Sequence, residues 1–244
     1  MPITVIIPAR LASTRFPEKV LASATGKPLV QHVAEAAARC KVAARVVVAT
    51  DHQRVVDALR PFGTPCVMTR VDHPNGTSRL AEAAAILGLK DDEVIVNAQG
   101  DEPEMAGEVI DAAADALLTT AGAEVGTVAT AITSAADFGD RNIVKVVLGT
   151  GGRALYFSRA PIPHDRDGVG LVTPLRHIGV YAYRVGFLSR YVAMAATPLE
   201  RTEQLEQLRV LEHGHTIGVR LCATAQQGID TPEQYAAFVA RYRG

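Results

Sequence analysis

Residues 3–19 read Ile-Thr-Val-Ile-Ile-Pro-Ala-Arg-Leu-Ala-Ser-Thr-Arg-Phe-Pro-Glu-Lys. The β-branched run from Ile3 to Ile7 predicts a buried strand, and the more polar residues after it predict a loop. An alanine-rich stretch around Leu29 to Arg39 then has the length and composition of a helix. A strand, a loop and a helix in this order begin a right-handed βαβ unit.

The same alternation continues to about residue 120. Further strands are expected at Arg45 to Ala49, Cys66 to Thr69 and Val94 to Asn97, and helices at Gln53 to Leu59, Thr77 to Leu87 and about Ala106 to Leu118. Continuous apolar runs such as Val46 to Val48 are typical of a sheet that is covered on both faces. The pattern predicts an α/β fold with a doubly wound, mostly parallel (mixed) central sheet.

Strand candidates follow one another more closely after about residue 120. They are Val125 to Ile132, Val144 to Leu148, Ala154 to Ser158 and Ile178 to Tyr183. The stretch Pro161 to Pro174 is rich in proline, glycine and charge, and it predicts a long substrate loop. The remaining elements expected are a helix over Leu199 to Glu212, a strand over Ile217 to Cys222 and a closing helix over Thr231 to Tyr242.

Composition excludes several classes of protein. Hydrophobic residues make up 48% of the chain and charged residues 21%, as in ordinary globular proteins. The formal net charge of -1 provides no basic field for nucleic acid or an anionic membrane. The cysteines, Cys40, Cys66 and Cys222, have no paired spacing, which argues against a disulfide scaffold or a zinc site. With no signal sequence and no apolar segment of roughly 20 residues, we expect a cytoplasmic protein with no nucleic-acid or membrane partner.

The loop after the first strand is the first candidate site, because ligands in open α/β sheets bind beyond the carboxyl ends of the strands. Arg10, Arg15 and Lys19, with Ser13 among them, offer guanidinium, ammonium and hydroxyl donors to a polyphosphate. By their charge alone, these residues would fit a solvent-exposed turn as well as a phosphate site. The loop has neither the G-x-x-x-x-G-K-[ST] pattern of a P-loop nor a G-x-G-x-x-G pattern, and residues 149–152 are better explained as a hairpin turn.

Together with its neighbours, the loop begins a series of motifs that runs along the chain. The series comprises Ile-Ile-Pro-Ala-Arg-x-x-Ser-Thr-Arg-x-Pro-x-Lys at 6–19, Ala-Thr-Asp at 49–51, Met-Thr-Arg at 68–70, His-x-Asn-Gly-Thr-x-Arg at 73–79, Val-Asn-x-Gln-Gly-Asp-Glu-Pro at 96–103, Ala-Leu-Tyr-Phe-Ser-Arg at 154–159 with Pro-Ile-Pro at 161–163, His-x-Gly-x-Tyr at 177–181, Leu-Glu-Gln-Leu-Arg at 205–209 and Gly-Ile-Asp-Thr-Pro at 228–232. In this order the motifs resemble the 3-deoxy-manno-octulosonate cytidylyltransferase (CMP-Kdo synthetase) family over essentially the whole chain.

The resemblance implies a fold like that of the nucleotide-diphospho-sugar transferases, with a small subdomain for dimerisation and sugar binding. It implies Mg²⁺-dependent transfer of CMP from CTP to the anomeric hydroxyl of 3-deoxy-D-manno-octulosonate (Kdo), with release of pyrophosphate, for lipopolysaccharide biosynthesis. Residues 1–244 would form a single domain, in which 1–120 bind the nucleotide and about 121–220 bind the sugar and the second subunit of a homodimer. Residues 221–244 would supply a returning strand end, a metal ligand and the last helix.

For the nucleotide side, the resemblance implies a catalytic set of Lys19, Arg15 and Asp101 and a nucleotide-binding set of Arg10, Ser13, Arg15, Lys19, Arg79 and Gln99. The Gln99 amide both donates and accepts hydrogen bonds, as the edge of cytosine requires. Asp51 ends a strand, and it could equally well cap the next helix or contact the ligand. Thr77 or Ser78 is expected to cap the helix that begins at about residue 77.

A divalent cation is implied by Asp101. This carboxylate follows an apolar strand and should reach the edge of the sheet that faces the triphosphate, where it is repelled unless a cation lies between them. The resemblance implies Asp230 as the second ligand of Mg²⁺. An aspartate before Thr-Pro can instead organise a turn or cap the last helix.

For the sugar acid, the resemblance implies Arg166, His177, Tyr181, Glu206 and Gln207. Arg166 would pair with the substrate carboxylate, and the others would hydrogen-bond to its hydroxyl groups. Spacing alone would make His177 and Tyr181 ordinary strand residues and Glu206 a solvated helix position. The contact between subunits is expected in the region from Tyr183 to Leu211.

The chain departs from the family pattern at two places. Asn75 stands where the family usually has serine, and the stretch from Arg166 to His177 is several residues shorter than usual. Activation of a related acid, such as 8-amino-Kdo or a sialic acid, is therefore an open alternative, as is a catalytically silent nucleotide-binding protein. A glycosyltransferase is a third reading, but the sequence Asp101-Glu-Pro lacks the Asp-x-Asp motif that such enzymes usually carry.

Overall fold

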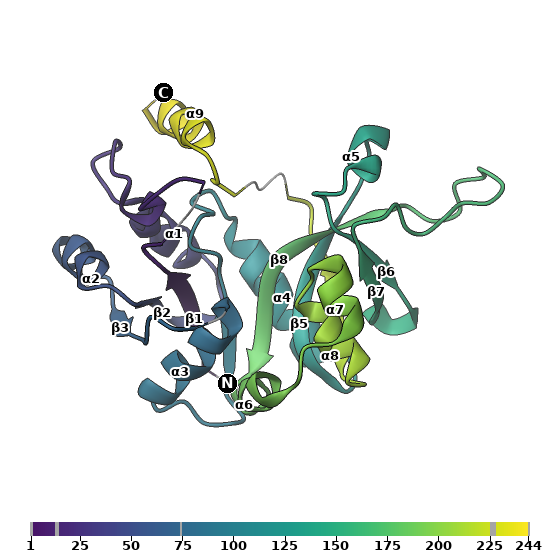
Figure 1. The fold of residues 1–244 in the computed structure, drawn as a ribbon, viewed down its shortest axis with the longest axis horizontal. Coiled ribbons are helices and arrows are strands. Elements are labelled where there is room, and N and C mark those ends of the chain that lie inside the picture. The colour runs from purple at the N-terminus through teal and green to yellow at the C-terminus, as the bar shows by residue number, and fades with distance from the viewer. Residues whose placement is uncertain (1, 13–14, 74, 225–227, 244) are drawn as a thin grey trace.

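A nine-stranded sheet organises the chain in the order β3-β2-β1-β4-β8-β5-β9, with β6 paired to β7 and β8 (Figure 1). The structure is a computed structural model that describes residues 2–12, 15–73, 75–224 and 228–243. The strands are β1 (Ile3–Ala9), β2 (Ala43–Thr50), β3 (Cys66–Met68), β4 (Val94–Asn97), β5 (Ala123–Ala131), β6 (Lys145–Leu148), β7 (Ala154–Ser158), β8 (Leu175–Arg184) and β9 (Thr216–Leu221). Every strand expected from the sequence is present within these described residues.

The direction of the strands divides the sheet. β1 is parallel to β2 and β4, and β2 is parallel to β3, as βαβ units require. β8 runs antiparallel to β4, β5 and β6, whereas β9 is parallel to β5. The predicted α/β fold with a mixed central sheet is confirmed, and the parallel character belongs mainly to its first half.

Helices cover both faces of the sheet (Figure 1). They are α1 (Leu29–Ala37), α2 (Gln53–Leu59), α3 (Gly76–Ile86), α4 (Gly107–Thr119), α5 (Ala135–Gly139), α6 (Val185–Ala193), α7 (Pro198–Glu203), α8 (Gln207–Glu212) and α9 (Pro232–Arg243). No helix in the described ranges is long and apolar enough to cross a membrane.

Two helical predictions need correction. The single helix expected over Leu199 to Glu212 is divided into α7 and α8, because Gln204 adopts a left-handed conformation with φ 54°. Helices α5 and α6 were not expected, and α6 follows β8 directly with no residue between the two. The turn predicted at 149–152 does join the antiparallel strands β6 and β7, and Gly151 and Gly152 there have φ 75°.

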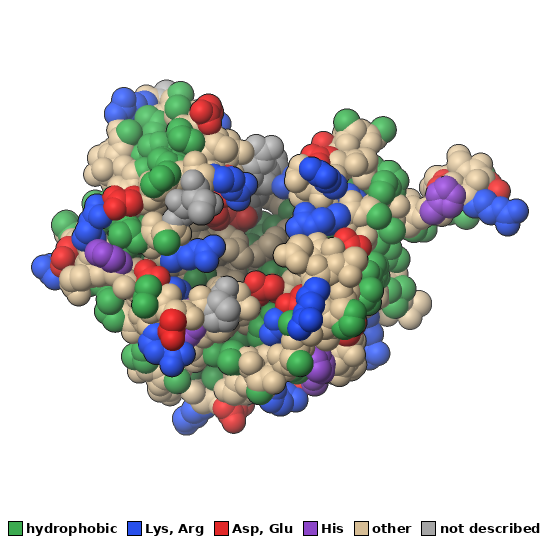
Figure 2. All heavy atoms as spheres, viewed as in Figure 1, with side chains coloured by type: hydrophobic (Ala, Val, Ile, Leu, Met, Phe, Trp, Pro, Cys, Tyr) green, Lys and Arg blue, Asp and Glu red, His purple; other side chains and the backbone are tan. Residues whose placement is uncertain are grey.

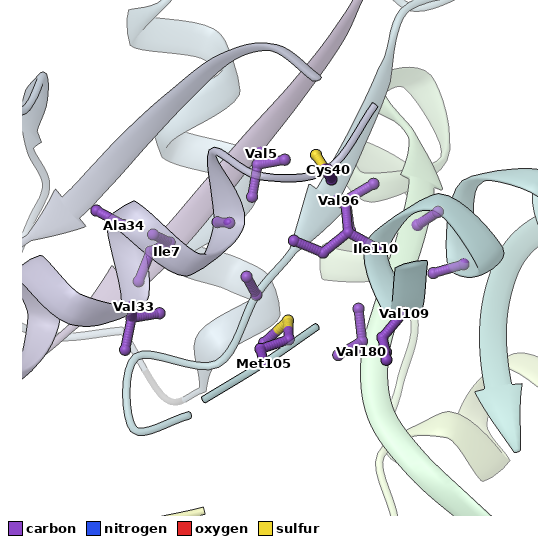
Figure 3. Close-up of a cluster of buried hydrophobic side chains, with 14 of the residues drawn as sticks. Val5, Ile7, Val33, Ala34, Cys40, Val96, Met105, Val109, Ile110 and Val180 are labelled. Atoms are coloured by element: carbon purple, nitrogen blue, oxygen red, sulfur yellow. The ribbon is translucent and has the colours of Figure 1, made fainter. Parts of the chain in front are cut away.

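Apolar side chains pack on both faces of the sheet. On one face Val5, Ile7, Val96 and Val180 belong to one cluster with Ile110 of α4, and Figure 3 shows Val96 and Val180 close to Ile110. On the other face the cluster contains Ile6, Leu80, Ile95, Phe157 and Phe187. Neighbours along β1 and β4 therefore point to opposite cores, which explains the uninterrupted apolar runs in these strands.

Candidate active site

A cleft of about 620 Å³ lies where β1 and β4 end. Figure 2 shows a hollow in the middle of this face with Lys, Arg, Asp and Glu side chains around it. The described residues predicted to bind nucleotide or metal all line this cleft, namely Arg10, Arg15, Lys19, Arg79, Gln99, Asp101 and Asp230. Ser13, also predicted to bind the nucleotide, lies outside the described residues.

Lys19 lies between two carboxylates that are far apart in the sequence. Its Nζ donates to Asp101 Oδ2 at 2.7 Å, to Asp230 Oδ1 at 2.9 Å and to the carbonyl oxygen of Ile229 at 2.9 Å. Arg15 adds an ion pair with Asp230 at 3.0 Å. Burial alone would lower the pKa of Lys19, but the charges and hydrogen bonds of the two aspartates together raise it, so the ammonium group remains charged.

The arrangement of Asp101 and Asp230 fits a divalent cation. Both carboxylates reach one positive group, the ammonium of Lys19, so they can share a cation placed between them. The described residues contain no cluster of three or more His, Cys, Asp or Glu side chains that could hold a metal. A metal at this pair would therefore complete its coordination with phosphate oxygens and water, as Mg²⁺ commonly does.

Asp51 holds Arg79 and does not cap a helix. Arg79 is 3% exposed, and its guanidinium donates to Asp51 Oδ2 at 2.8 Å and to the carbonyl oxygen of Arg70 at 3.2 Å. The N-cap of α2 is His52, whose Nδ1 accepts from the backbone N–H of Arg54. The sequence did not predict the ion pair between Asp51 and Arg79, because these residues are 28 positions apart and no local pattern joins them.

Asn75 caps α3 in place of the predicted Thr77 or Ser78. Its Oδ1 accepts from the backbone N–H of Ser78 at 2.9 Å. Asparagine and serine are both strong N-cap residues, so the departure from the family pattern keeps the cap. Thr77 is free to point elsewhere, and its hydroxyl donates to Glu206 Oε2 at 3.3 Å.

Gln99 lies between the cleft and a second cavity. Its Nε2 donates to the carbonyl oxygen of Gly179 at 2.9 Å, which leaves the amide oxygen for a ligand. The next residue, Gly100, approaches β1 so closely that a Cβ atom there would lie 2.6 Å from the carbonyl oxygen of Pro8. A glycine at this position lets the chain turn from β4 toward Asp101.

The second cavity has a volume of about 260 Å³ and adjoins the first, with Gly76 and Gln99 common to both walls. Tyr181, Glu206 and Gln207, three of the predicted sugar-binding residues, line it. Tyr191 OH donates to Glu206 Oε2 at 3.4 Å. Loss of hydration raises the pKa of Glu206, although hydrogen bonds from Thr77 and Tyr191 oppose the shift.

His177 lies behind the second cavity and is not part of its wall. Its ring packs edge-on against Phe157 at 5.0 Å and lies 5.3 Å from Tyr181. Burial lowers the pKa of His177 to about 3, so the ring is neutral. Because the Thr127 hydroxyl donates to the carbonyl oxygen of Val180, it accepts from His177 Nε2 at 3.0 Å. His177 is thus placed to orient Tyr181.

Arg166 is not brought to either cavity. The loop predicted at 161–174 projects away from the body of the molecule (Figure 1). The Arg166 side chain is 91% exposed, and its ion-pair partner is the adjacent Asp167 at 3.9 Å. A contact between Arg166 and a substrate carboxylate would require this loop to fold back, so that role stays a prediction.

Comparison with known proteins extends over the full chain. Residues 4–217 match the model of the cytidylyltransferase family. The 3-deoxy-manno-octulosonate cytidylyltransferase of Herminiimonas arsenicoxydans is 52% identical over 242 residues, covering 96% of each chain, and that of Acidovorax ebreus (strain TPSY) is 50% identical over 246 residues, covering 95% of this chain and 94% of the relative.

A solved structure agrees with these relatives. The structure of CMP:2-keto-3-deoxy-manno-octonic acid synthetase complexed with CTP superposes with a TM-score of 0.92 at 37% identity, covering 100% of this chain and 99% of that one. Sequence, fold and cleft thus agree, and the chain belongs to the cytidylyltransferase family, among its 3-deoxy-manno-octulosonate cytidylyltransferases.

Proposed function

We propose that the protein transfers CMP from CTP to the anomeric hydroxyl of Kdo, giving CMP-Kdo and pyrophosphate. The observation that carries this proposal is the pair of adjoining cavities that share Gln99. One has the cations that a triphosphate requires, and the other has the tyrosine, amide and carboxyl groups that suit a polyhydroxylated acid. Residues 1–120 would bind the nucleotide, and most of the sugar cavity would come from about 121–220.

In the reaction, the anomeric oxygen of the sugar attacks the α-phosphorus of CTP. The bond from that phosphorus to the oxygen bridging the α- and β-phosphates breaks, pyrophosphate leaves, and the hydroxyl proton passes to solvent. Catalysis then depends on positioning and charge stabilisation, and no protein nucleophile is needed. Lys19, Arg15 and Arg10 would stabilise charge on the α-phosphate and on the departing pyrophosphate.

Asp101 and Asp230 would hold Mg²⁺. When bound, the metal would neutralise phosphate charge and lower the pKa of the attacking hydroxyl. Since Lys19 occupies the space between these carboxylates, its ammonium would have to move to the triphosphate when the metal arrives. The geometry supports this exchange because Lys19 lines the same cleft as Arg10 and Arg15.

The cellular setting follows from the same proposal. CMP-Kdo made in the cytoplasm would serve lipopolysaccharide biosynthesis. A homodimer formed through the region from Tyr183 to Leu211 is supported by two apolar side chains, Val192 and Leu199, which are 49% and 40% exposed in this region.

Release of pyrophosphate from the four ribonucleoside triphosphates, with Mg²⁺ and Kdo, tests the proposal directly. We expect release with CTP and not with the other three nucleotides. A panel of acids with CTP, including 8-amino-Kdo and a sialic acid, identifies the preferred acceptor. Preference for another nucleotide or another acid would refute the assigned substrates, and no release with any acid would leave a silent nucleotide-binding protein.

A further inference from the structure

Two residues other than glycine have a positive φ in the described chain, and each lies at one of the two cavities. Gln204, with φ 54°, is part of the wall of the second cavity. Glu18, also with φ 54°, immediately precedes Lys19 of the first cavity. The left-handed region is unfavourable for a residue with a Cβ atom, and such strain is concentrated at functional segments. The conformation of Glu18 therefore has to be held by its contacts.

Glu18 lies in a tight turn that leads into Lys19. The backbone N–H of Lys19 donates to the carbonyl oxygen of Phe16 at 3.2 Å, which places Pro17 and Glu18 at the two central positions. Proline followed by a left-handed residue is the signature of a type II turn, in which the second central position normally has glycine or asparagine. The backbone of this turn has no need of glutamate, so the reason for glutamate lies in its carboxylate.

The carboxylate of Glu18 joins the turn to helix α2. Arg54, in the first turn of α2, donates from Nη1 to Glu18 Oε1 at 2.5 Å and from Nη2 to Oε2 at 2.8 Å. Two parallel hydrogen bonds fix the direction of both side chains, which a single contact does not. Neither residue belongs to the described wall of either cavity. An effect of this pair on a ligand there has to pass through the turn.

Lys19 is the residue whose placement depends on the turn. Its side chain is held by Asp101 and Asp230, and on its C-terminal side Val20 is 4% exposed in the apolar core. When the ammonium group moves to the triphosphate, as the proposed function requires, its hydrogen bonds to the two aspartates are lost. The backbone on both sides of Lys19 then sets how far the ammonium group reaches, and Glu18 is its neighbour on the N-terminal side.

We propose that Glu18 and Arg54 are positioning residues, a clamp that fixes the turn so that the ammonium group of Lys19 reaches the triphosphate. This inference rests on the proposed function, because it takes Lys19 as a ligand of the triphosphate. Arg54 acts through Glu18, and Glu18 acts through the backbone. The side chains are 55% and 47% exposed, and the paired geometry distinguishes them from the many exposed ion pairs that have no measurable effect.

Two variants separate the clamp from the turn. Arg54→Met removes the guanidinium and leaves the strained turn, whereas Glu18→Gly removes the clamp and relaxes the turn. Both should lower kcat/KM for CTP about tenfold, because a displaced cation stabilises the reacting phosphate less well. Neither should change KM for the sugar acid. Glu18→Gly should melt within about 2 °C of wild type, since the relaxed turn offsets the lost pair.

A conservative change and a matched control complete the set. Arg54→Lys keeps the charge without the two parallel donors, so its loss in kcat/KM for CTP should be smaller than that of Arg54→Met. Arg60→Met is the control, because Arg60 forms an exposed pair with Asp57 of the same helix. Its kcat/KM for CTP should equal that of wild type. A loss as large as that of Arg54→Met would overturn the clamp.

The outcomes separate the clamp from the proposed function. Wild-type kcat/KM for CTP in either Arg54→Met or Glu18→Gly would overturn the clamp, since the turn would then place Lys19 unaided. An equal rise in KM for the sugar acid would overturn it too, because the effect would not be specific to the triphosphate. If wild type releases no pyrophosphate with any acid, the proposed function itself is refuted. The dissociation constant for CTP then decides on the clamp: about tenfold weaker binding by both variants supports it, and unchanged binding overturns it.

Discussion

The two adjoining cavities are built from different chemistry. The wall of the first places Arg10, Arg15 and Lys19 against Asp101 and Asp230. The wall of the second, as far as the chain is described, contains three tyrosines and four side-chain amides, with Glu206 as its one carboxyl group. Charge attracts over a distance and tolerates small displacements, whereas hydrogen bonds weaken steeply when their geometry changes. The second cavity therefore depends more on a rigid frame.

We call the hydrogen-bonded group of Lys145, Ser158, Arg159 and Glu203 the frame of this cavity, and it supports the turn between α7 and α8. The Arg159 guanidinium donates to the carbonyl oxygen of Glu203 at 2.7 Å, and the Glu203 carboxylate accepts from the hydroxyl of Ser158 at 2.6 Å. Lys145, which is fully buried, donates to the carbonyl oxygens of Arg159 at 2.7 Å and Asp140 at 2.8 Å. In the first cavity, by contrast, Lys19 and Arg15 are held by carboxylates of the cavity wall itself, Asp101 and Asp230.

Loss of a carboxylate in the charged cavity should have the largest effect. Asp101→Asn removes a charge that Lys19 uses and that a divalent cation requires. We expect kcat to fall about a thousandfold, as with other electrostatic groups at reacting centres, while the protein stays folded. Pyrophosphate release and circular dichroism measure the two properties, and removal of Mg²⁺ with a chelator should reduce wild type to a similar rate.

Asp115→Asn is the control for this variant. Asp115 pairs with Arg220 on the outer surface of α4, and its side chain is 52% exposed. Its loss should leave the rate unchanged, because the pair lies outside both cavities. Near-normal turnover of Asp101→Asn would remove the basis for the metal site.

The next largest effect concerns the ion pair at the edge of the charged cavity. Asp51 and Arg79 have side chains that are 10% and 4% exposed. Asp51→Asn leaves Arg79 buried and without its partner charge, so we expect the free energy of unfolding to fall by about 3 kcal/mol. Because Arg79 lines the nucleotide cleft, KM for CTP should rise and KM for the sugar acid should not.

Asp57→Asn provides the comparison, because its pair with Arg60 is exposed, at 50% and 71%. The loss there should be at most about 0.5 kcal/mol. Chemical denaturation measures both variants. A destabilised Asp51→Asn protein that binds CTP normally would make Arg79 a structural residue with no part in nucleotide binding.

The charged cavity was largely predictable from the sequence. Arg10 and Lys19 follow β1, Asp101 follows β4, and the carboxyl ends of adjacent parallel strands meet at one edge of the sheet. Asp230 was harder, because 211 positions separate it from Lys19 and only the family motif pointed to it. The alternation of strands and helices likewise predicted the strand positions closely.

Tertiary packing decided what the sequence did not reveal. The Arg79–Asp51 pair joins residues 28 positions apart, and the left-handed Gln204 follows Glu203, whose carbonyl oxygen accepts a hydrogen bond from the distant Arg159. The role of Arg166 came from a family whose loop is longer, and here the loop projects from the body. Local patterns carry no information about such contacts, so the frame of the second cavity could not be predicted.

A smaller effect, specific to the second cavity, is expected for the frame itself. Arg159→Met removes the hydrogen bond to the carbonyl oxygen of Glu203, which precedes the left-handed Gln204. KM for the sugar acid should rise up to tenfold with KM for CTP unchanged, and Arg159→Lys should recover part of the loss. Arg153→Met is matched, because Arg153 also donates to a carbonyl oxygen, that of Ala121, at 2.8 Å. Equal changes in both KM values would reject a positioning role.

The smallest effect concerns the carboxyl group of the second cavity. Loss of hydration raises the pKa of Glu206 in the folded state above its ordinary value of 4.5. The folded protein therefore binds a proton at Glu206 more tightly than the unfolded chain does. The ionised side chain lowers the stability of the folded protein at pH values above the folded pKa, and this effect is absent below pH 4.5, where Glu206 is protonated in both states. Glu206→Gln should raise the melting temperature by about 2 °C at pH 8, a gain that disappears as the pH falls toward 4.5.

Glu104→Gln serves as the control, because Glu104 forms an exposed pair with Arg241 and should show no such gain. Melting curves between pH 4 and pH 8 measure both variants. A loss of stability in Glu206→Gln at pH 8 would mean that the hydrogen bonds from Thr77 and Tyr191 outweigh the lost hydration. The second cavity would then depend on a fixed charge, and the contrast between the two cavities would disappear at this residue.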